Sequence, residues 1–344
     1  MIRVVHVVGS LAGGGAERLI LDLCRCSPSG LHQEVQPLVG GGAIEPEFRD
    51  AGVRLLSPVA RGGRMGPGGL ARLISRVKRF DVVHTHLWAG DAWGRLAGLG
   101  ASRPVVSTEH NTRGDSRWRA AIARSMAPLS SQFIAVSESA SVGLPAERVQ
   151  VIANGIDLVD HRPRPWPSPL EKRVLFIGRL ERQKGADVLL SALERLPDVR
   201  ADLLGEGRER SALMRQAASL GGRARLHGWL ADPGPLLDVC PVVVMPSRWE
   251  GFGLVAVEAM AAGRVVVASA VDALPHVLGD VGVMVPPDDP MELAKTLDGL
   301  FSDPDALLAR SRRGPQQAAA FDIHKTAEAT AALYRQVVMG RNRS

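Results

Sequence analysis

The sequence predicts an α/β protein with two domains, each built on a parallel sheet. Short apolar strands alternate with amphipathic helices along the chain, which is typical of parallel sheets. This alternation stops at a proline-rich segment, residues 161–169, and then restarts. A chain of 344 residues is also long enough for two domains of ordinary size.

The composition excludes several classes of protein. With 45% hydrophobic and 23% charged residues, the chain has a globular composition. No run of about 18 apolar residues is present, so we expect no membrane-spanning helix. The first residues, 1–8, are too short for a signal segment and predict a strand. The 3 cysteines give no disulfide framework, and we therefore expect a cytoplasmic protein.

The net charge of +6 is unevenly distributed. Residues 1–165 contain 20 Lys and Arg against 14 Asp and Glu, whereas the remainder has 22 of each. A basic first half is compatible with anionic lipid, a phosphorylated acceptor or nucleic acid, and equally with a solvated surface. The helix predicted over 70–80 carries Arg72, Arg76, Lys78 and Arg79, a basic set compatible with contact to an anionic membrane.

A glycine-rich turn follows the first strand, residues 2–8, and precedes a helix over 19–24. Gly13, Gly14 and Gly15 allow the backbone to approach an anion there. They do not form a dinucleotide fingerprint, because Arg18 occupies the position of the third glycine. The second strand, 34–39, ends in three glycines instead of an acid that would bind ribose. A dinucleotide oxidoreductase is therefore disfavoured.

Histidines mark the ends of two later strands of the first half. His84 and His86 share one side of the strand predicted over 81–86. No Cys or acid is spaced to complete a tetrahedral metal site, so we expect no metal, with His84 packed and His86 facing the ligand edge. His110 follows the strand over 104–108, at the sheet edge where an α/β fold places its ligand. A loop histidine that caps a helix is the alternative interpretation.

The rest of the first half is less informative. Further basic residues follow His110 and either border an acceptor groove or are solvated: Arg113, Arg117, Arg119 and Arg124. Strands are also predicted over 53–56, 132–136 and 149–152. The prolines at 163, 165, 167 and 169 then predict a stiff linker, which we assign to residues 161–172.

The second half opens with a strand over 173–178 and a helix over 188–193. Arg179 and Lys184 flank the loop between them, and a planar guanidinium with a point charge suits a diphosphate. Close-approach glycines, Gly205 and Gly207, follow the next strand, over 200–204. Trp229 follows the strand over 224–227, either beside a ligand or as a core anchor. Strands over 242–245, 265–268 and 281–285 and helices over 235–240, 290–301, 303–312 and 321–338 complete this half.

The most informative stretch runs from residue 246 to residue 263. Glu250 lies in a loop after a buried strand, and Glu258 lies just over one turn into the helix that starts near Leu254. The backbone N–H groups of residues 251–255 lie between these carboxylates, where a helix start favours anions. Such a site suits a sugar hydroxyl, a ribose diol and a phosphate together. An ordinary loop with surface acids is the alternative.

These segments together resemble the retaining glycosyltransferases of the GT-B fold, family 4 type (glycosyl transferases group 1). The two glutamates have the Glu-x7-Glu spacing of that family, and residues 178–185 match its Gly-Arg-Leu…Lys-Gly motif. Residues 14–18, Gly-Gly-Ala-Glu-Arg, match its entry loop. Residues 154–157 match its Asn-Gly-Ile-Asp turn, with Ala153 where proline is usual. The resemblance covers nearly the whole chain and is most specific in the second half.

The resemblance implies two Rossmann-like domains facing across a cleft. Residues 1–160 form the acceptor domain, 173–320 the nucleotide-sugar domain, and 321–344 a terminal helix that packs back on the first domain. Four residues are implied as catalytic: His110, Arg179, Lys184 and Glu250. The implied donor-binding residues are Gly13, Gly14, Gly15, Arg179, Lys184, Gly205, Gly207, Trp229, Glu250, Gly251, Phe252, Gly253, Leu254 and Glu258.

The implied reaction is metal-independent transfer with retention, in which the nucleotide sugar is a co-substrate and no cofactor is required. A hexose or N-acetylhexosamine moves from a nucleotide-diphosphate sugar, UDP- rather than GDP-linked, to a hydroxyl of a small molecule, glycolipid or glycan. The acceptor is expected to be lipid-linked or phosphorylated, with peripheral contact at the inner membrane face and no nucleic acid. A nucleotide-sugar epimerase, an NAD-type oxidoreductase and a non-catalytic sugar-binding module are the alternatives.

Overall fold

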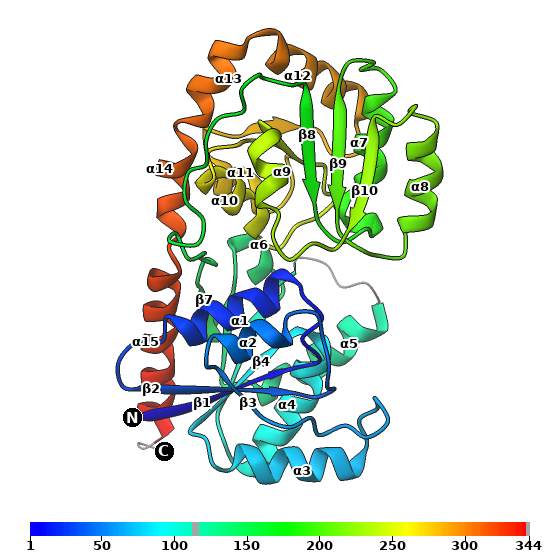
Figure 1. Ribbon diagram of the computed structural model, residues 1–344. Helices are drawn as coiled ribbons and strands as arrows, with labels where there is room; N and C mark the ends of the chain where they lie inside the picture. Colours follow the sequence, from blue (N-terminus) through cyan, green and yellow to red (C-terminus); the bar gives the residue numbers. More distant parts are fainter. Residues whose placement is uncertain (112–116, 342–344) are drawn as a thin grey trace. The chain divides into compact units, whose positions relative to one another are not determined.

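The computed structural model describes residues 1–111 and 117–341, and the chain forms two compact units (Figure 1). Unit 1 contains Met1–Asp157 and Ile323–Ser344, and unit 2 contains Leu158–Asp322. Each unit is a parallel sheet flanked by helices, which confirms the predicted α/β class with two Rossmann-like domains.

Unit 1 is built on a parallel sheet of seven strands in the order β3-β2-β1-β4-β5-β6-β7. The order reverses between β1 and β4, so the loops that follow these neighbouring strands diverge at the sheet edge where such folds bind ligands. The strands are β1 Ile2–Val8, β2 Leu31–Pro37, β3 Arg54–Leu55, β4 Val82–His86, β5 Val105–Glu109, β6 Gln132–Ala135 and β7 Val149–Val151.

One long helix of unit 1, α4 (Leu87–Ala101), packs directly on the sheet through glycines. A Cβ added at Gly90 would lie 2.4 Å from the carbonyl oxygen of Val7, and one at Gly94 would lie 2.5 Å from Thr85 Cγ2. The helix can therefore approach β1 and β4 only without side chains at these positions. The other helices of the unit are α1 Gly15–Arg25, α2 Glu45–Asp50, α3 Pro67–Val77, α5 Arg117–Ser125, α6 Glu138–Ser141 and α15 Ile323–Arg341.

Helix α15 belongs to unit 1 although it follows the second sheet in the sequence. Its first backbone N–H, on Ile323, donates to the carbonyl of Ile156 over 3.0 Å. The hydroxyl of Thr326 donates to the carbonyl of Ala153 over 2.9 Å. Further along, Tyr334 is fully buried, with its hydroxyl 2.5 Å from Nδ1 of His84. The Asn-Gly turn and strand β4 thus hold this helix.

Unit 2 is built on a parallel sheet of six strands in the order β10-β9-β8-β11-β12-β13. Its strands are β8 Arg173–Ile177, β9 Arg200–Leu204, β10 Ala224–Gly228, β11 Val242–Met245, β12 Val265–Ser269 and β13 Val283–Val285. Strands β11 and β12 are entirely buried and almost entirely apolar, as expected for central strands covered on both faces. Its helices are α7 Ala186–Leu193, α8 Arg210–Ala218, α9 Gly234–Val239, α10 Leu254–Ala261, α11 Leu274–Leu278, α12 Pro290–Ser302, α13 Pro304–Ser311 and α14 Gly314–Ala318.

The proline-rich segment, predicted to be a linker, packs on the body of unit 2. The guanidinium of Arg164 makes two hydrogen bonds to the carboxylate of Asp238, at 2.6 and 2.7 Å. The guanidinium of Arg264 donates to the carbonyl of Pro165 over 2.6 Å and lies 5.8 Å from the ring centre of Trp166. These contacts fix residues 164–166 against the unit.

Within residues 1–111 and 117–341, no helix combines the length and the apolar character needed to span a membrane.

Candidate functional site

The main candidate site lies where the strand order of unit 2 reverses, between β8 and β11. These strands are parallel neighbours, with Val174 paired to Val242, so the loops after them leave the same edge of the sheet. Residues 178–185 follow β8 and residues 246–253 follow β11. An open parallel sheet binds ligands at this edge, and both motifs singled out from the sequence lie on it.

The two loops are packed backbone against backbone. A Cβ added at Gly185, whose φ is +67°, would lie 1.9 Å from the carbonyl oxygen of Pro246, so no other residue fits there. The N–H of Arg248 donates to the carbonyl of Gln183 over 2.8 Å, and the Gln183 amide donates to the carbonyl of Trp249 over 3.1 Å. The loops therefore form one rigid edge.

Lys184 and Glu250 are in direct contact at this edge. The ammonium Nζ lies 2.5 Å from the carboxylate oxygen Oε2, and Glu250 is only 7% exposed. Ser247 donates to the same oxygen over 3.4 Å, and the N–H of Glu250 donates to Asp272 over 2.8 Å. A phosphate that approaches this edge would compete with the carboxylate of Glu250 for the ammonium of Lys184.

Arg179 is exposed at the start of the loop after β8. One of its guanidinium nitrogens donates to Oε1 of Gln183 over 2.9 Å, which orients the planar group. Within the described residues it has no carboxylate partner, so most of its donors remain available to an anion. The structure thus brings together three of the four residues predicted as catalytic: Arg179, Lys184 and Glu250.

Helix α10 begins at Leu254, four residues after Glu250, and presents unused backbone donors. Gly253 caps the helix with a φ of +95°. The N–H groups of Leu254 and Val255 have no hydrogen-bond partner in the described part of the chain, as expected for the first turn of a helix. The ring of Phe252 is buried in edge contact with Phe321, 5.5 Å away, so Phe252 can offer only its backbone to a ligand.

Glu258 lies on α10, one turn after its start, and is half-buried. No described residue pairs with its carboxylate. The structure gives no contact between Glu258 and Glu250. The second carboxylate is therefore a separate group on the same helix start, free to accept hydrogen bonds from a ligand.

The glycines Gly205 and Gly207 have a structural explanation. A Cβ on Gly205, whose φ is +134°, would lie 1.9 Å from the carbonyl oxygen of Gly178, and one on Gly207 would lie 2.2 Å from that of Leu180. The close approach is therefore between the loops after β9 and β8. Trp229 is 44% exposed, so its interpretation as a core anchor is wrong.

Arg248 is a site residue that sequence reasoning missed. Its guanidinium makes two bonds to the carboxylate of Asp187, at 3.0 and 2.7 Å, and one to Asp288 at 2.6 Å. Burial alone would raise the pKa of Asp187, but the bonds from Arg248 outweigh it and the pKa is lowered. Arg248 thus ties the loop after β11 to the start of α7. Arg248 lies within the stretch 246–263 and Asp187 lies two residues after the 178–185 motif, but the sequence does not show that they pair across 61 positions.

The glycine loop of unit 1 begins helix α1. Gly13 has a φ of +99°, Gly14 caps the helix and Gly15 is its first residue. The N–H of Gly14 donates to the carboxylate of Glu17 over 3.1 Å. An anion at this loop would therefore have to displace Glu17 from one of the three amides.

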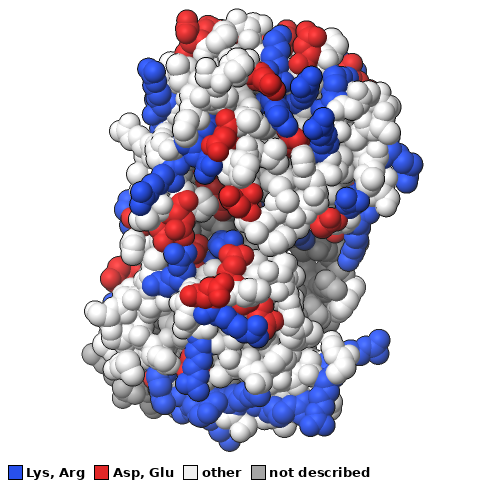
Figure 2. Space-filling view, viewed as in Figure 1, with Lys and Arg blue, Asp and Glu red and all other residues white. Residues whose placement is uncertain are grey.

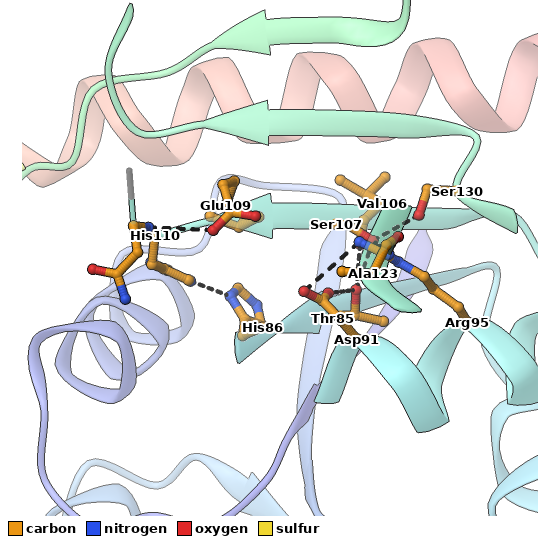
Figure 3. A network of polar contacts seen from close by, with 12 residues as sticks. Thr85, His86, Asp91, Arg95, Val106, Ser107, Glu109, His110, Ala123 and Ser130 are labelled. Carbon is orange, nitrogen blue, oxygen red and sulfur yellow. Dashed lines mark hydrogen bonds and ion pairs between the residues drawn. The ribbon is translucent and has the colours of Figure 1, made fainter. Parts of the chain in front are cut away.

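His110 follows β5 and lies at one end of a hydrogen-bonded series of buried histidine rings. Its Nε2 lies 3.1 Å from Nδ1 of His86, which is labelled beside it in Figure 3. Nε2 of His86 in turn lies 3.0 Å from Nδ1 of His6. His86 is fully buried, so the expectation that it faces the ligand edge is wrong. Burial lowers the pKa of His6 and of His110 to about 4, and holds that of His86 well below its usual value.

His6 is the partner that sequence reasoning did not find for His84 and His86. The ligand-type atoms of the three rings lie within 4.8 Å of one another, and all three are buried. His6 lies opposite His84 in the register of β1 and β4. The sequence does not show that these two strands are neighbours, so this partner can be identified only once the sheet order is known.

A second buried network holds α4 against β4 and β5 (Figure 3). The hydroxyl of Thr85 donates to Asp91 over 2.5 Å, and the guanidinium of Arg95 donates to Ser107 over 3.1 Å and lies 3.7 Å from Asp91. Burial, with the charge of Asp91 as a second cause, raises the pKa of Glu109 to about 7. The network anchors β5 at Ser107, three residues before His110.

The basic residues predicted to border an acceptor groove are only partly described. Arg113 and the side chains of Arg117 and Arg119 lie outside the described residues. Arg124 is exposed on α5, as are Trp118 and Ile122.

Comparison with known proteins matches both halves of the chain. Residues 13–160 match the family model Glycosyltransferase Family 4, and residues 171–303 match Glycosyl transferases group 1. A glycogen synthase of Mycobacterium tuberculosis is 31% identical, covering 96% of this chain and 89% of the relative. A phosphatidyl-myo-inositol mannosyltransferase of Mycolicibacterium smegmatis is 33% identical, covering 88% and 80%.

Solved structures agree with the fold. A crystal structure of Anabaena HepE in complex with UDP-glucose superimposes with a TM-score of 0.89 at 23% identity, covering 98% of this chain and 100% of that one. Sucrose-phosphate synthase of Thermosynechococcus elongatus gives a TM-score of 0.78 at 22% identity, covering 99% and 100%. With both family models, the relatives and the two parallel-sheet units in agreement, the chain belongs to the group 1 and family 4 glycosyltransferases and is a glycosyltransferase of the GT-B fold.

Proposed function

We propose that the protein transfers a hexose or N-acetylhexosamine from a UDP-sugar to an acceptor hydroxyl, with retention and without a metal. One observation carries this proposal. At one sheet edge of unit 2, the exposed guanidinium of Arg179, the Lys184–Glu250 pair and the unpaired N–H groups at the start of α10 converge. Fixed cations and helix-start amides are the groups that bind a diphosphate.

The reaction requires that a leaving diphosphate be stabilised. The bond between the anomeric carbon and the diphosphate oxygen breaks, a bond to the acceptor oxygen forms on the same face, and the acceptor proton passes to the departing phosphate. Negative charge grows on the phosphate oxygens, where Arg179 and Lys184 act as preorganised donors. Because these two cations supply the charge that a metal would otherwise provide, the proposed step needs no metal.

Different groups would hold the rest of the donor. In the proposal, Glu250 and Glu258 accept hydrogen bonds from the sugar and the ribose. His110 accepts one from the transferred sugar, beside which the family resemblance places it. UDP is preferred as the nucleotide because Anabaena HepE is seen in complex with UDP-glucose. An inositol-containing or phosphorylated acceptor is favoured by relatives named phosphatidyl-myo-inositol mannosyltransferase and D-inositol 3-phosphate glycosyltransferase.

The test is product analysis on the full chain with a panel of UDP- and GDP-sugars, with and without acceptors such as inositol phosphates. A glycosylated acceptor and free UDP are expected. An isomeric nucleotide sugar formed without acceptor would instead identify an epimerase. A donor that binds but is neither transferred nor hydrolysed would identify a sugar-binding module, and either result would overturn the proposal.

We also propose peripheral membrane contact through the basic face of unit 1. Figure 2 shows Lys and Arg gathered along the lower edge of the view, where Figure 1 places α3. Arg61, Arg64, Lys78 and Arg79 are exposed, whereas Arg72 and Arg76 donate to backbone carbonyls of unit 1. Sedimentation with anionic vesicles should recover the wild type at low salt and lose it in Arg61→Glu/Arg64→Glu. Equal recovery with neutral vesicles would refute this contact.

A further inference from the structure

Four side chains of unit 1 form a continuous hydrogen-bonded line that ends at His110. Gln33 Oε1 lies 2.8 Å from His6 Nε2, His6 Nδ1 lies 3.0 Å from His86 Nε2, and His86 Nδ1 lies 3.1 Å from His110 Nε2. Gln33 lies on β2, His6 on β1 and His86 on β4, and His110 directly follows β5. The site residue is therefore linked to the interior of the sheet through two buried rings.

The amide of Gln33 determines which atoms of this line donate a hydrogen bond and which accept one. Its Nε2 donates to the carbonyl of Leu23 and to the hydroxyl of Ser27, both over 2.9 Å. Turning the amide over would set its oxygen against the Leu23 carbonyl, so Oε1 faces His6. A carbonyl oxygen can only accept, and His6 must therefore carry its proton on Nε2.

The protonated nitrogen of His6 determines which nitrogen of His86 carries the proton, and that of His86 determines the same for His110. A neutral imidazole has one N–H and one bare nitrogen, and burial keeps these rings neutral. With its proton on Nε2, His6 accepts at Nδ1, so His86 must donate from Nε2. His86 then accepts at Nδ1, so His110 must donate from Nε2.

We infer that Gln33, His6 and His86 are positioning residues that lock His110 in the tautomer with a bare Nδ1. His110 therefore offers a hydrogen-bond acceptor to a hydroxyl and does not donate one. Its Nδ1 has no partner in the described part of the chain. The line ends at an amide that cannot take up a proton, so it orients His110 and is not a path for proton release. This role rests on the proposed contact between His110 and the transferred sugar.

The same contacts argue against a metal held by His6, His84 and His86. The two nitrogens of His84 lie 2.5 Å from the Tyr334 hydroxyl and 2.6 Å from Thr108 Oγ1. Every ring nitrogen of the three histidines is thus within hydrogen-bond distance of another group. A metal would have to break at least one bond in each ring and leave its partner unpaired in the core.

The test is ¹⁵N spectroscopy of the full chain labelled in its histidine rings, where long-range ¹H–¹⁵N correlations show which nitrogen carries the proton. Wild-type His6, His86 and His110 should all be protonated on Nε2. Gln33→Met removes the acceptor and should give His110 a mixture of tautomers. Thr108→Val is the matched control, since it removes a partner of His84 outside the line and should leave His110 unchanged.

Kinetics separate this role from the proposed function. Gln33→Met should lower kcat/KM for transfer about 2- to 10-fold, the range expected for one misdirected hydrogen bond, and Thr108→Val should leave it unchanged. Protonation of wild-type His110 on Nδ1 would overturn the inference, as would an unchanged tautomer in Gln33→Met. Stoichiometric binding of added Zn²⁺ that shifts the three rings would also overturn it. The spectra need no turnover, so absent transfer with the expected tautomers would refute the function alone.

Discussion

At the residue scale, the contact between Lys184 and Glu250 carries the most information about the chemistry. The ion pair is mostly buried, with side-chain exposures of 19% and 9%. Its members come from two loops 66 residues apart in the sequence. Truncating one partner of such a pair leaves an uncompensated charge, so a variant tests both binding and the integrity of the edge. A control that keeps the charge is therefore needed.

Lys184→Ala should lower the turnover number about 10²-fold or more, because it removes a donor to charge that develops on the leaving diphosphate. Steady-state kinetics at saturating donor measure this. Lys184→Arg, which keeps a cation beside Glu250, should retain more activity than Lys184→Ala. Turnover equal to wild type in the alanine variant would remove the proposed role.

His6 makes a second prediction at this scale, about acid stability. Its pKa is about 4 in the folded protein, because burial disfavours the charged ring, and 6.5 is the ordinary value. Between these values the unfolded chain binds more protons, so the free energy of unfolding falls as the pH drops from 6.5 to 4. The loss from His6 alone is about 3 kcal/mol.

Urea unfolding of wild type and His6→Gln at pH 7 and pH 5 tests this prediction. The stability of wild type should fall more between these pH values than that of His6→Gln. The raised pKa of Glu109 acts in the opposite direction, but it is common to both proteins and cancels in the comparison. Equal losses in the two proteins would show that His6 is not held neutral.

At the element scale, helix α4 depends on glycines that touch the sheet. Gly90→Ala should destabilise the protein by about 1–3 kcal/mol, because the new Cβ would lie 2.4 Å from the Val7 carbonyl oxygen. Gly299→Ala in α12 is the matched control. It meets no atom within 4 Å and should stabilise by about 0.5–1 kcal/mol. Chemical denaturation measures both, and the same sign for the two variants would contradict this account.

The helices and strands with a clear pattern of apolar residues could be predicted from the sequence, and those without one could not. The buried strands β8, β11 and β12 were predicted within one residue, because apolar runs bounded by glycine and proline are unambiguous. Helix α4 was not predicted, because its glycines and alanines carry little periodic signal and are explained only by the sheet it packs on. Helix α8 was missed as well, since only Leu213 and Ala217 of its residues are buried.

The residues of the candidate site could be predicted only where they lie close together in the sequence. The Lys-Gly and Glu-x7-Glu motifs each lie within one strand-loop-helix unit, so the residues of unit 2 could be named in advance. Arg248 and Asp187 belong to separate strand-loop-helix units, and His6 and His86 lie on separate strands. Such pairs depend on sheet order and register, which a single sequence does not reveal.

At the scale of the whole molecule, the chain returns to its first unit through α15. Tyr334 is fully buried there, and Tyr334→Ala should cost about 3–5 kcal/mol through the cavity it leaves. Tyr334→Phe keeps the ring, loses only the contact with His84, and should cost about 1 kcal/mol. Thermal unfolding of the full chain compares them. If Tyr334→Ala were as stable as Tyr334→Phe, α15 would not be part of the core of unit 1.

The central claim is that the edge formed by the loops after β8 and β11 binds the diphosphate of a nucleotide sugar. The most direct measurement is a calorimetric titration of the full chain with UDP and with uridine, repeated on Arg179→Ala/Lys184→Ala. Wild type should bind UDP far more tightly than uridine, and the double variant should lose at least about tenfold in UDP affinity, or 1.4 kcal/mol. Equal UDP affinity in wild type and the double variant would contradict the claim.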